Sequence, residues 1–111
     1  MNISKYLDIN TIVEVQSKLK LPNLDIKHPG QWALRIAENL NASEYVNPIN
    51  GSHLFDPKEF EEKNIILSFF ECKTKEYFQY GRKFTPNLSI IDTLMWQPID
   101  EIKSVIHSSV V

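Results

Sequence analysis

Apolar and polar residues follow a period of two in some stretches, which is typical of short strands. Residues 23–27 (N-L-D-I-K) and 44–47 (E-Y-V-N) alternate in this way and predict two strands with one buried face. Residues 65–71 begin with I-I-L-S-F-F, which is apolar except for Ser68. Strands that are buried on both faces have this composition, and they are common in parallel sheets covered by helices. The pattern therefore predicts a third strand, in the centre of a sheet.

Two stretches, one before the first of these strands and one after it, have helical signals. Thr11 and Glu14 have the spacing of a capping box, which predicts a helix to about Lys20, where Pro22 follows. Pro29 suits the first turn of a second helix, which should run to about Asn41. The apolar residues of this second helix recur at helical spacing and should form its inward face; they are Trp32, Ala33, Ile36, Ala37 and Leu40.

The clearest helix start in the chain is at Asp56, which should cap a helix whose first residue is Pro57. Glu59 completes a capping box there, and a hydrophobic staple should join Phe55 to Phe60. This helix should end near Asn64, a residue that tolerates the left-handed conformation.

Ser89 has the same relation to Asp92, so the two residues should cap a short helix. A last helix should begin at Pro98, with Ile99, Ile102 and Ile106 on one face. The order of elements is then α-β-α-β-α-β. It predicts a single α/β domain over residues 1–111, with a small three-stranded, mainly parallel sheet (strands near 23–27, 44–47 and 65–71) flanked by helices.

Composition limits the classes of function. Apolar residues make up 42% of the 111 residues and the net charge is −2, so a folded chain is expected and a nucleic-acid partner is not. No apolar run is long enough to span a bilayer, and the N-terminus has no secretory signal. The single cysteine, Cys72, suits a reducing compartment, which predicts a cytoplasmic protein. The histidines, His28, His53 and His107, lie on different predicted elements, so neither a metal site nor a cofactor is predicted.

Two polar stretches are candidate ligand sites. Asn50, Gly51 and His53 lie in a loop after the second predicted strand, where a glycine allows close approach to a ligand such as a phosphate. A plain turn explains the same residues and is the more frequent case. Tyr77 lies in a polar and aromatic stretch, residues 73–83, that could stack on a sugar or a base. Solvated loop residues are again the commoner explanation.

No catalytic pair can be assigned. Cys72 follows a predicted strand, but no histidine is near it in the sequence, which favours an inert thiol. Ser89 and Asp92 have the spacing of a helix cap, and the capping role needs no further hypothesis. The catalytic residues are therefore unknown at this point.

Two segments, with the residues between them, resemble the WbqC-like protein family. Residues 45–56 (Y-V-N-P-I-N-G-S-H-L-F-D) resemble its Y-x-N-P-x-G-G-x-x-L-Y-D segment, with Asn50 in place of the first glycine. Residues 84–95 (F-T-P-N-L-S-I-I-D-T-L-M) resemble its F-x-P-x-L-S-I-I-D-x-L-M segment. The positions that match these two motifs are Tyr45, Asn47, Gly51, Asp56, Phe84, Ser89 and Asp92.

The resemblance covers most of residues 30–106. Family members begin with a Q-P-x-Y-x-P-x-x-G-Y type of segment that is not found here, so the chain resembles the C-terminal half of such a protein. The resemblance implies a role in bacterial surface-polysaccharide (O-antigen) biosynthesis. It also implies a transferase that moves an acyl group, such as that of an amino acid, to a sugar.

Three functional hypotheses follow. The first is a WbqC-like domain that binds a sugar or a nucleotide-sugar, with Asn47, Gly51 and His53 bordering a pocket that faces the Ser89 region. The second is a non-catalytic binding or assembly module, a fragment of a larger enzyme that forms a homodimer through a surface its other half normally covers. The third is nucleotide binding by the loop of residues 50–53.

Overall fold

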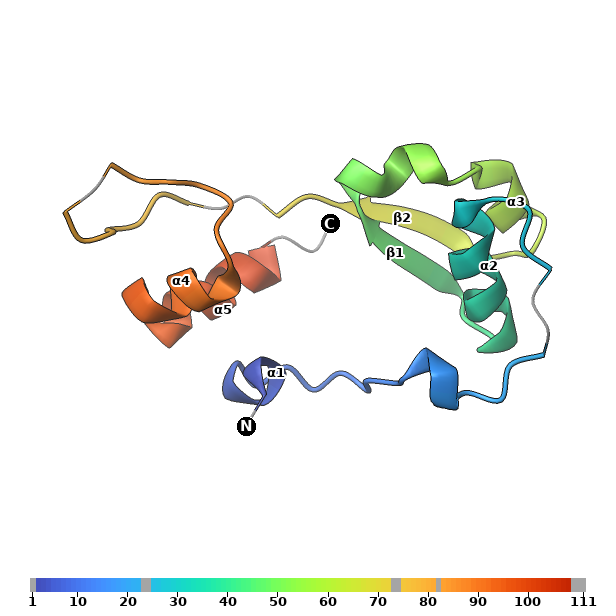
Figure 1. Cartoon of the computed structure of the whole chain (residues 1–111), viewed down its shortest axis with the longest axis horizontal. Helices are drawn as coiled ribbons and strands as arrows, with labels where there is room; N and C mark the ends of the chain where they lie inside the picture. The colour runs from blue at the N-terminus through green and yellow to red at the C-terminus, as the bar shows by residue number, and fades with distance from the viewer. Residues whose placement is uncertain (1, 23–24, 73–74, 82, 109–111) are drawn as a thin grey trace. The chain divides into compact units, whose positions relative to one another are not determined.

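The computed structural model describes residues 2–22, 25–72, 75–81 and 83–108 (Figure 1). The chain divides into two compact units, which we call the sheet unit (Val13–Phe70) and the helical unit (Met1–Ile12 with Glu71–Val111). The elements in chain order are α1 (Ile3–Tyr6), the 3-10 helix η1 (Gln16–Lys18), α2 (Pro29–Asn39), β1 (Glu44–Pro48), the 3-10 helix η2 (Ile49–Leu54), α3 (Pro57–Glu61), β2 (Ile66–Phe70), α4 (Ile90–Trp96) and α5 (Ile99–Ser108).

The sheet unit contains a parallel pair of strands, β1 and β2, in which Tyr45 lies opposite Leu67. The mixed α/β class and the parallel pairing are therefore confirmed, but the described residues form two strands and a third strand is not confirmed. Of the first predicted strand, residues 23–27, residues 23 and 24 lie outside the described part of the chain, and Asp25–Lys27 form no strand.

The core of the sheet unit lies on one face of the sheet, against α2 and α3. Its buried residues are Leu34 and Ala37 from α2, Phe60 from α3 and Ile65 just before β2. Tyr45 and Leu67 from the two strands pack against this cluster, together with Phe55 and Ala42. The rings of Phe55 and Phe60 lie 6.0 Å apart, which confirms the predicted hydrophobic staple.

The other face of the sheet is open. Val46 is 51% exposed and Ile66 is 63% exposed, so the prediction that the last strand is buried on both faces is wrong. The physical reason is that α2 and α3 contribute their buried side chains to one core cluster, on the side of Tyr45 and Leu67. The outward positions of the same strands have no apolar partner in that cluster.

The predicted face of α2 is wrong in part, because Ala37 is buried and Ala33 and Ile36 are half-buried, but two of the predicted residues are exposed. The helix begins at Pro29 and ends at Asn39 as expected, but its buried residues are Gly30, Gln31, Leu34 and Ala37, while Trp32 and Leu40 are exposed. Gly30 explains this orientation, because a β-carbon there would lie 2.0 Å from the carbonyl oxygen of Leu54. The start of α2 therefore packs directly on the backbone at the end of η2, which rotates Trp32 outward.

The helix predicted over residues 11–20 does not form. Only η1 is helical in this stretch, and Ile12 is 87% exposed. A short helix is marginal unless its apolar face is covered, and the exposed side chains of Ile12, Val13 and Val15 have no such cover. Thr11 and Glu14 therefore make no capping box.

In the helical unit, α1 was not expected from the sequence. Asn2 caps it, because its Oδ1 accepts a hydrogen bond from the backbone N–H of Lys5. Within the same unit Lys103 of α5 forms an ion pair with Asp8, with 2.5 Å between Nζ and Oδ2, which ties the end of α1 to α5. The helices α4 and α5 begin where the sequence predicts, after Ser89 and after Pro98.

Candidate functional site

The loop of η2 begins at the carboxyl end of β1, the edge at which parallel sheets commonly bind ligands. Asn47, near the end of β1, supports the start of this loop through hydrogen bonds. Tyr45 donates a hydrogen bond from its hydroxyl to Oδ1 of Asn47 (3.1 Å), and Nδ2 of Asn47 donates to the carbonyl of Pro48 (3.0 Å). Burial raises the pKa of Tyr45, so its phenol keeps the proton that it donates.

Gly51 leaves room for the side chain of Asn47. A β-carbon at Gly51 would lie 2.5 Å from Nδ2 of Asn47, so the residue must be a glycine for the asparagine to keep its position. Asn47 and Gly51 thus hold the loop in shape. Asn50 and His53 are exposed, and within the described part of the chain neither side chain makes a hydrogen bond. Of the four predicted ligand residues in this loop, these two have side chains available to a ligand.

The second region is built around Asp92 of α4. Its Oδ2 accepts hydrogen bonds from the hydroxyl of Tyr77 (2.6 Å) and from Nε2 of Gln79 (2.9 Å). Gln79 is buried, and its Oε1 accepts from the backbone N–H of Thr85 (2.8 Å). The carboxylate therefore fixes the segment before α4 onto the first turn of that helix. Gln79 was missed in the sequence because nothing local marks a polar residue as buried.

Of the three predicted capping boxes, the two at α3 and α4 are half correct. Ser89 caps α4 by accepting from the N–H of Ile91, and Asp56 caps α3 by accepting from the N–H of Lys58. The second member of each box has another role. Asp92 binds Tyr77 and Gln79, whereas Glu59 binds His28 and Gln31, so neither is engaged in the cap.

A cavity of about 170 Å³ lies beside this second region, within the helical unit. Tyr77, the remaining predicted ligand residue, lines it together with Thr93 of α4. The ring of Tyr77 lies 5.1 Å from that of Phe84, edge to face, which fixes its position. The other lining residues are Cys72, Lys75, Glu76, Ile90, Gln97, Glu101, Ile102, Val105 and Ile106.

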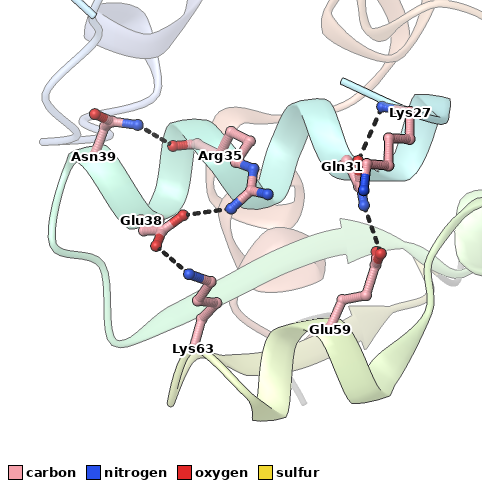
Figure 2. A network of polar contacts seen from close by, with 7 residues as sticks. All are labelled: Lys27, Gln31, Arg35, Glu38, Asn39, Glu59 and Lys63. Atoms are coloured by element: carbon pink, nitrogen blue, oxygen red, sulfur yellow. Dashed lines mark hydrogen bonds and ion pairs between the residues drawn. The ribbon is translucent and has the colours of Figure 1, made fainter. Parts of the chain in front are cut away.

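A third polar network joins α2 to α3, and Figure 2 shows most of it. Glu59 accepts from Nε2 of Gln31 (2.6 Å), and its second oxygen lies 3.0 Å from Nε2 of His28. The hydrogen bond from Gln31, and secondarily that from His28, lowers the pKa of Glu59. No local pattern predicts this contact, because His28 and Glu59 are 31 positions apart.

At the other end of the same helices, Glu38 lies between Lys63 (2.7 Å) and Arg35 (3.0 Å), as Figure 2 shows. The hydrogen bond from Lys63, followed by that from Arg35, lowers the pKa of Glu38. These contacts lie within the sheet unit, and the ion pair of Glu38 with Lys63 joins α2 to the turn that follows α3. Their arrangement is that of a structural brace.

Among the residues that the structure describes, no cluster of three or more histidines, cysteines or acidic residues could hold a metal ion. In the same residues, no helix combines the length and the hydropathy that crossing a membrane requires.

The fold is that of a small α/β protein with a parallel strand pair, and its two motif segments form the η2 loop and the start of α4. The chain belongs to the WbqC-like protein family, whose model matches residues 1–104. The match covers essentially the whole chain. It therefore also includes the first 29 residues, to which the resemblance assigned no family segment, and it is not confined to a C-terminal half. Neither a curated protein nor a solved structure matches the chain.

Proposed function

We propose that the chain acts in the biosynthesis of bacterial surface polysaccharides and binds a sugar or a nucleotide-sugar through its η2 loop. Family membership supports the setting. Transfer of an acyl group to the sugar is the reaction that we propose on the same basis. The observation that carries the binding site is the pair of unengaged polar side chains, Asn50 and His53, at the carboxyl end of a parallel strand.

The contacts within the loop indicate which residues have a structural role and which are available to bind the sugar. Asn47 uses its amide on Tyr45 and Pro48, and Gly51 leaves room for that amide. We propose that these two residues preorganise the loop, so that less free energy is lost in ordering it when the sugar binds. Asn50 offers an amide donor and acceptor for sugar hydroxyls, and His53 offers a ring that can bond or stack.

The test is a thermal-shift screen of the whole chain with nucleotide-sugars, free amino sugars and acyl donors. A ligand that binds only the folded state raises the melting temperature, so at least one sugar compound should do so. His53→Ala should remove most of that rise. His107→Ala is the matched control, because His107 is also exposed but lies on α5, and it should keep the rise.

An equal loss in both histidine variants would contradict the proposed site. If no sugar compound raises the melting temperature, sugar binding itself is wrong. The alternative would then be preferred, a non-catalytic binding or assembly module. The open face of the sheet, with Val46 and Ile66 exposed, favours that alternative, since exposed apolar side chains on one face suit association.

A further inference from the structure

The cavity of the helical unit has an apolar body. Ile90 from α4 and Ile102, Val105 and Ile106 from α5 provide aliphatic walls. A cavity of about 150 Å³ with such walls holds a molecule of the size of benzene, and this cavity measures about 170 Å³. Its volume and walls therefore suit an apolar group of six or seven carbon atoms.

Two of the residues that line the same cavity, Tyr77 and Thr93, have hydroxyl groups in contact with each other. A phenol has a single proton, and Tyr77 donates it to Asp92 at 2.6 Å. The hydroxyl of Thr93 lies 3.3 Å from that of Tyr77, so in this pair Thr93 must be the donor. The oxygen of Thr93 then keeps its lone pairs, and it can accept a hydrogen bond from a ligand.

The charges of the lining residues act in the same direction. Among the lining residues that the structure describes, Glu76 and Glu101 contribute two carboxylates and Lys75 one ammonium group, which gives these residues a net charge of −1. A protonated amine is favoured near a net negative charge, whereas a carboxylate is disfavoured.

We propose that this cavity binds a small apolar molecule, or an apolar part of a larger one, that ends in a hydrogen-bond donor, and that Thr93 accepts that hydrogen bond. The site is separate from the η2 loop and does not depend on the proposed sugar binding. Asp92 has a positioning role in it, because it fixes the direction in which Tyr77 and Thr93 donate.

Four probes of the same shape test the ligand class: toluene, benzyl alcohol, benzylamine and benzoate, each titrated into the whole chain and followed by NMR. Benzyl alcohol and benzylamine should bind about 2- to 10-fold more tightly than toluene, the factor that one additional hydrogen bond provides. Benzoate should bind more weakly than toluene. Contacts between the probe and the methyl groups of Ile102, Val105 and Ile106 should appear in nuclear Overhauser spectra.

Two pairs of measurements locate the site. Thr93→Val should reduce the affinity for benzyl alcohol to about that for toluene and leave toluene unchanged, because only the hydroxyl is removed. Ile90→Phe should fill part of the cavity and weaken all probes at least about tenfold. The control is Ile91→Phe on the same helix, at a residue that is 62% exposed, and it should change nothing.

Equal affinities of toluene and benzyl alcohol for the unsubstituted chain would overturn the proposal, and so would an equal effect of the two phenylalanine substitutions. Absence of contacts with the α5 methyl groups would do the same, and that result does not depend on whether a variant folds. His53→Ala should leave all four affinities unchanged. A failure of this cavity is therefore distinguishable from a failure of the sugar site.

Discussion

At the scale of single residues, Ser89 and Asp92 have distinct roles although their spacing suggested a shared one. Ser89 is exposed and satisfies one backbone N–H at the start of α4. Asp92 is half-buried and accepts two side-chain hydrogen bonds from residues 13 and 15 positions before it. Asp92 thus holds the segment that contains Tyr77 and Gln79 against α4, and a capping pattern alone does not reveal this role.

The two substitutions to alanine should therefore differ in cost. Ser89→Ala removes one exposed cap, which should lower the free energy of unfolding by about 1 kcal/mol. Asp92→Ala deprives both Tyr77 and Gln79 of a charged acceptor, and we expect a loss of about 2–3 kcal/mol. Urea denaturation followed by circular dichroism measures both values. Equal losses would mean that Asp92 acts only as a cap residue.

At the scale of elements, the sequence predicted best those features that local chemistry decides. The starts of α2, α3, α4 and α5 are correct because a proline or a capping side chain fixes each of them within a few residues. Asn64, the predicted left-handed residue after α3, has φ of 55°. Such features depend on the nearest neighbours in the chain, which the sequence shows directly.

The elements that failed depend on distant partners. The helix predicted over residues 11–20 lacks a surface to cover its apolar face. The face that α2 turns to the core is set by the close contact of Gly30 with the backbone of Leu54. These residues are 24 positions apart, and the periodicity of the helix does not show such a contact. For the candidate site, the η2 loop could be found from its glycine and its place after a strand. The cavity of the helical unit could not, since its walls come from three separate segments.

The brace between α2 and α3 should depend on pH. Glu38 and Glu59 both have a lowered pKa in the folded chain, whereas in the unfolded chain they titrate near 4.5. Such a group stabilises the fold above the unfolded pKa, and this contribution is lost as the pH falls through the lower folded pKa. The free energy of unfolding should therefore decrease as the pH falls below about 4.5.

Urea denaturation at pH 7, 5, 4 and 3 measures that decrease. A variant with Glu38→Gln and Glu59→Gln should be less stable at pH 7, by no more than about 1 kcal/mol per partly exposed group, and should show a shallower decline. Glu62→Gln is the control, because Glu62 is exposed and has no side-chain partner among the described residues. Parallel pH curves for the double variant and the unsubstituted chain would refute the assignment.

At the scale of the whole molecule, the structure contains two compact units, and the sequence predicts one domain. Few side chains are deeply buried in the described part of the chain; the apolar ones are Leu7, Leu34, Ala37, Phe60, Ile65 and Ile102. A unit of fewer than about 60 residues is marginal on its own, because it buries too little of its surface. We therefore propose that the units fold together as the single predicted domain.

The two tryptophans allow this to be tested, because Trp32 lies in the sheet unit and Trp96 in the helical unit. Each is partly exposed, so replacement by phenylalanine should cost little. Trp96→Phe leaves fluorescence that reports the sheet unit, and Trp32→Phe leaves fluorescence that reports the helical unit. In one cooperative domain both transitions should occur at the same urea concentration, and both should coincide with that seen by circular dichroism.

Toluene bound in the cavity should then shift the two midpoints together, since a ligand of the folded state stabilises all that unfolds with it. Separate midpoints, or a shift confined to the Trp96 signal, would show that the units are independent domains.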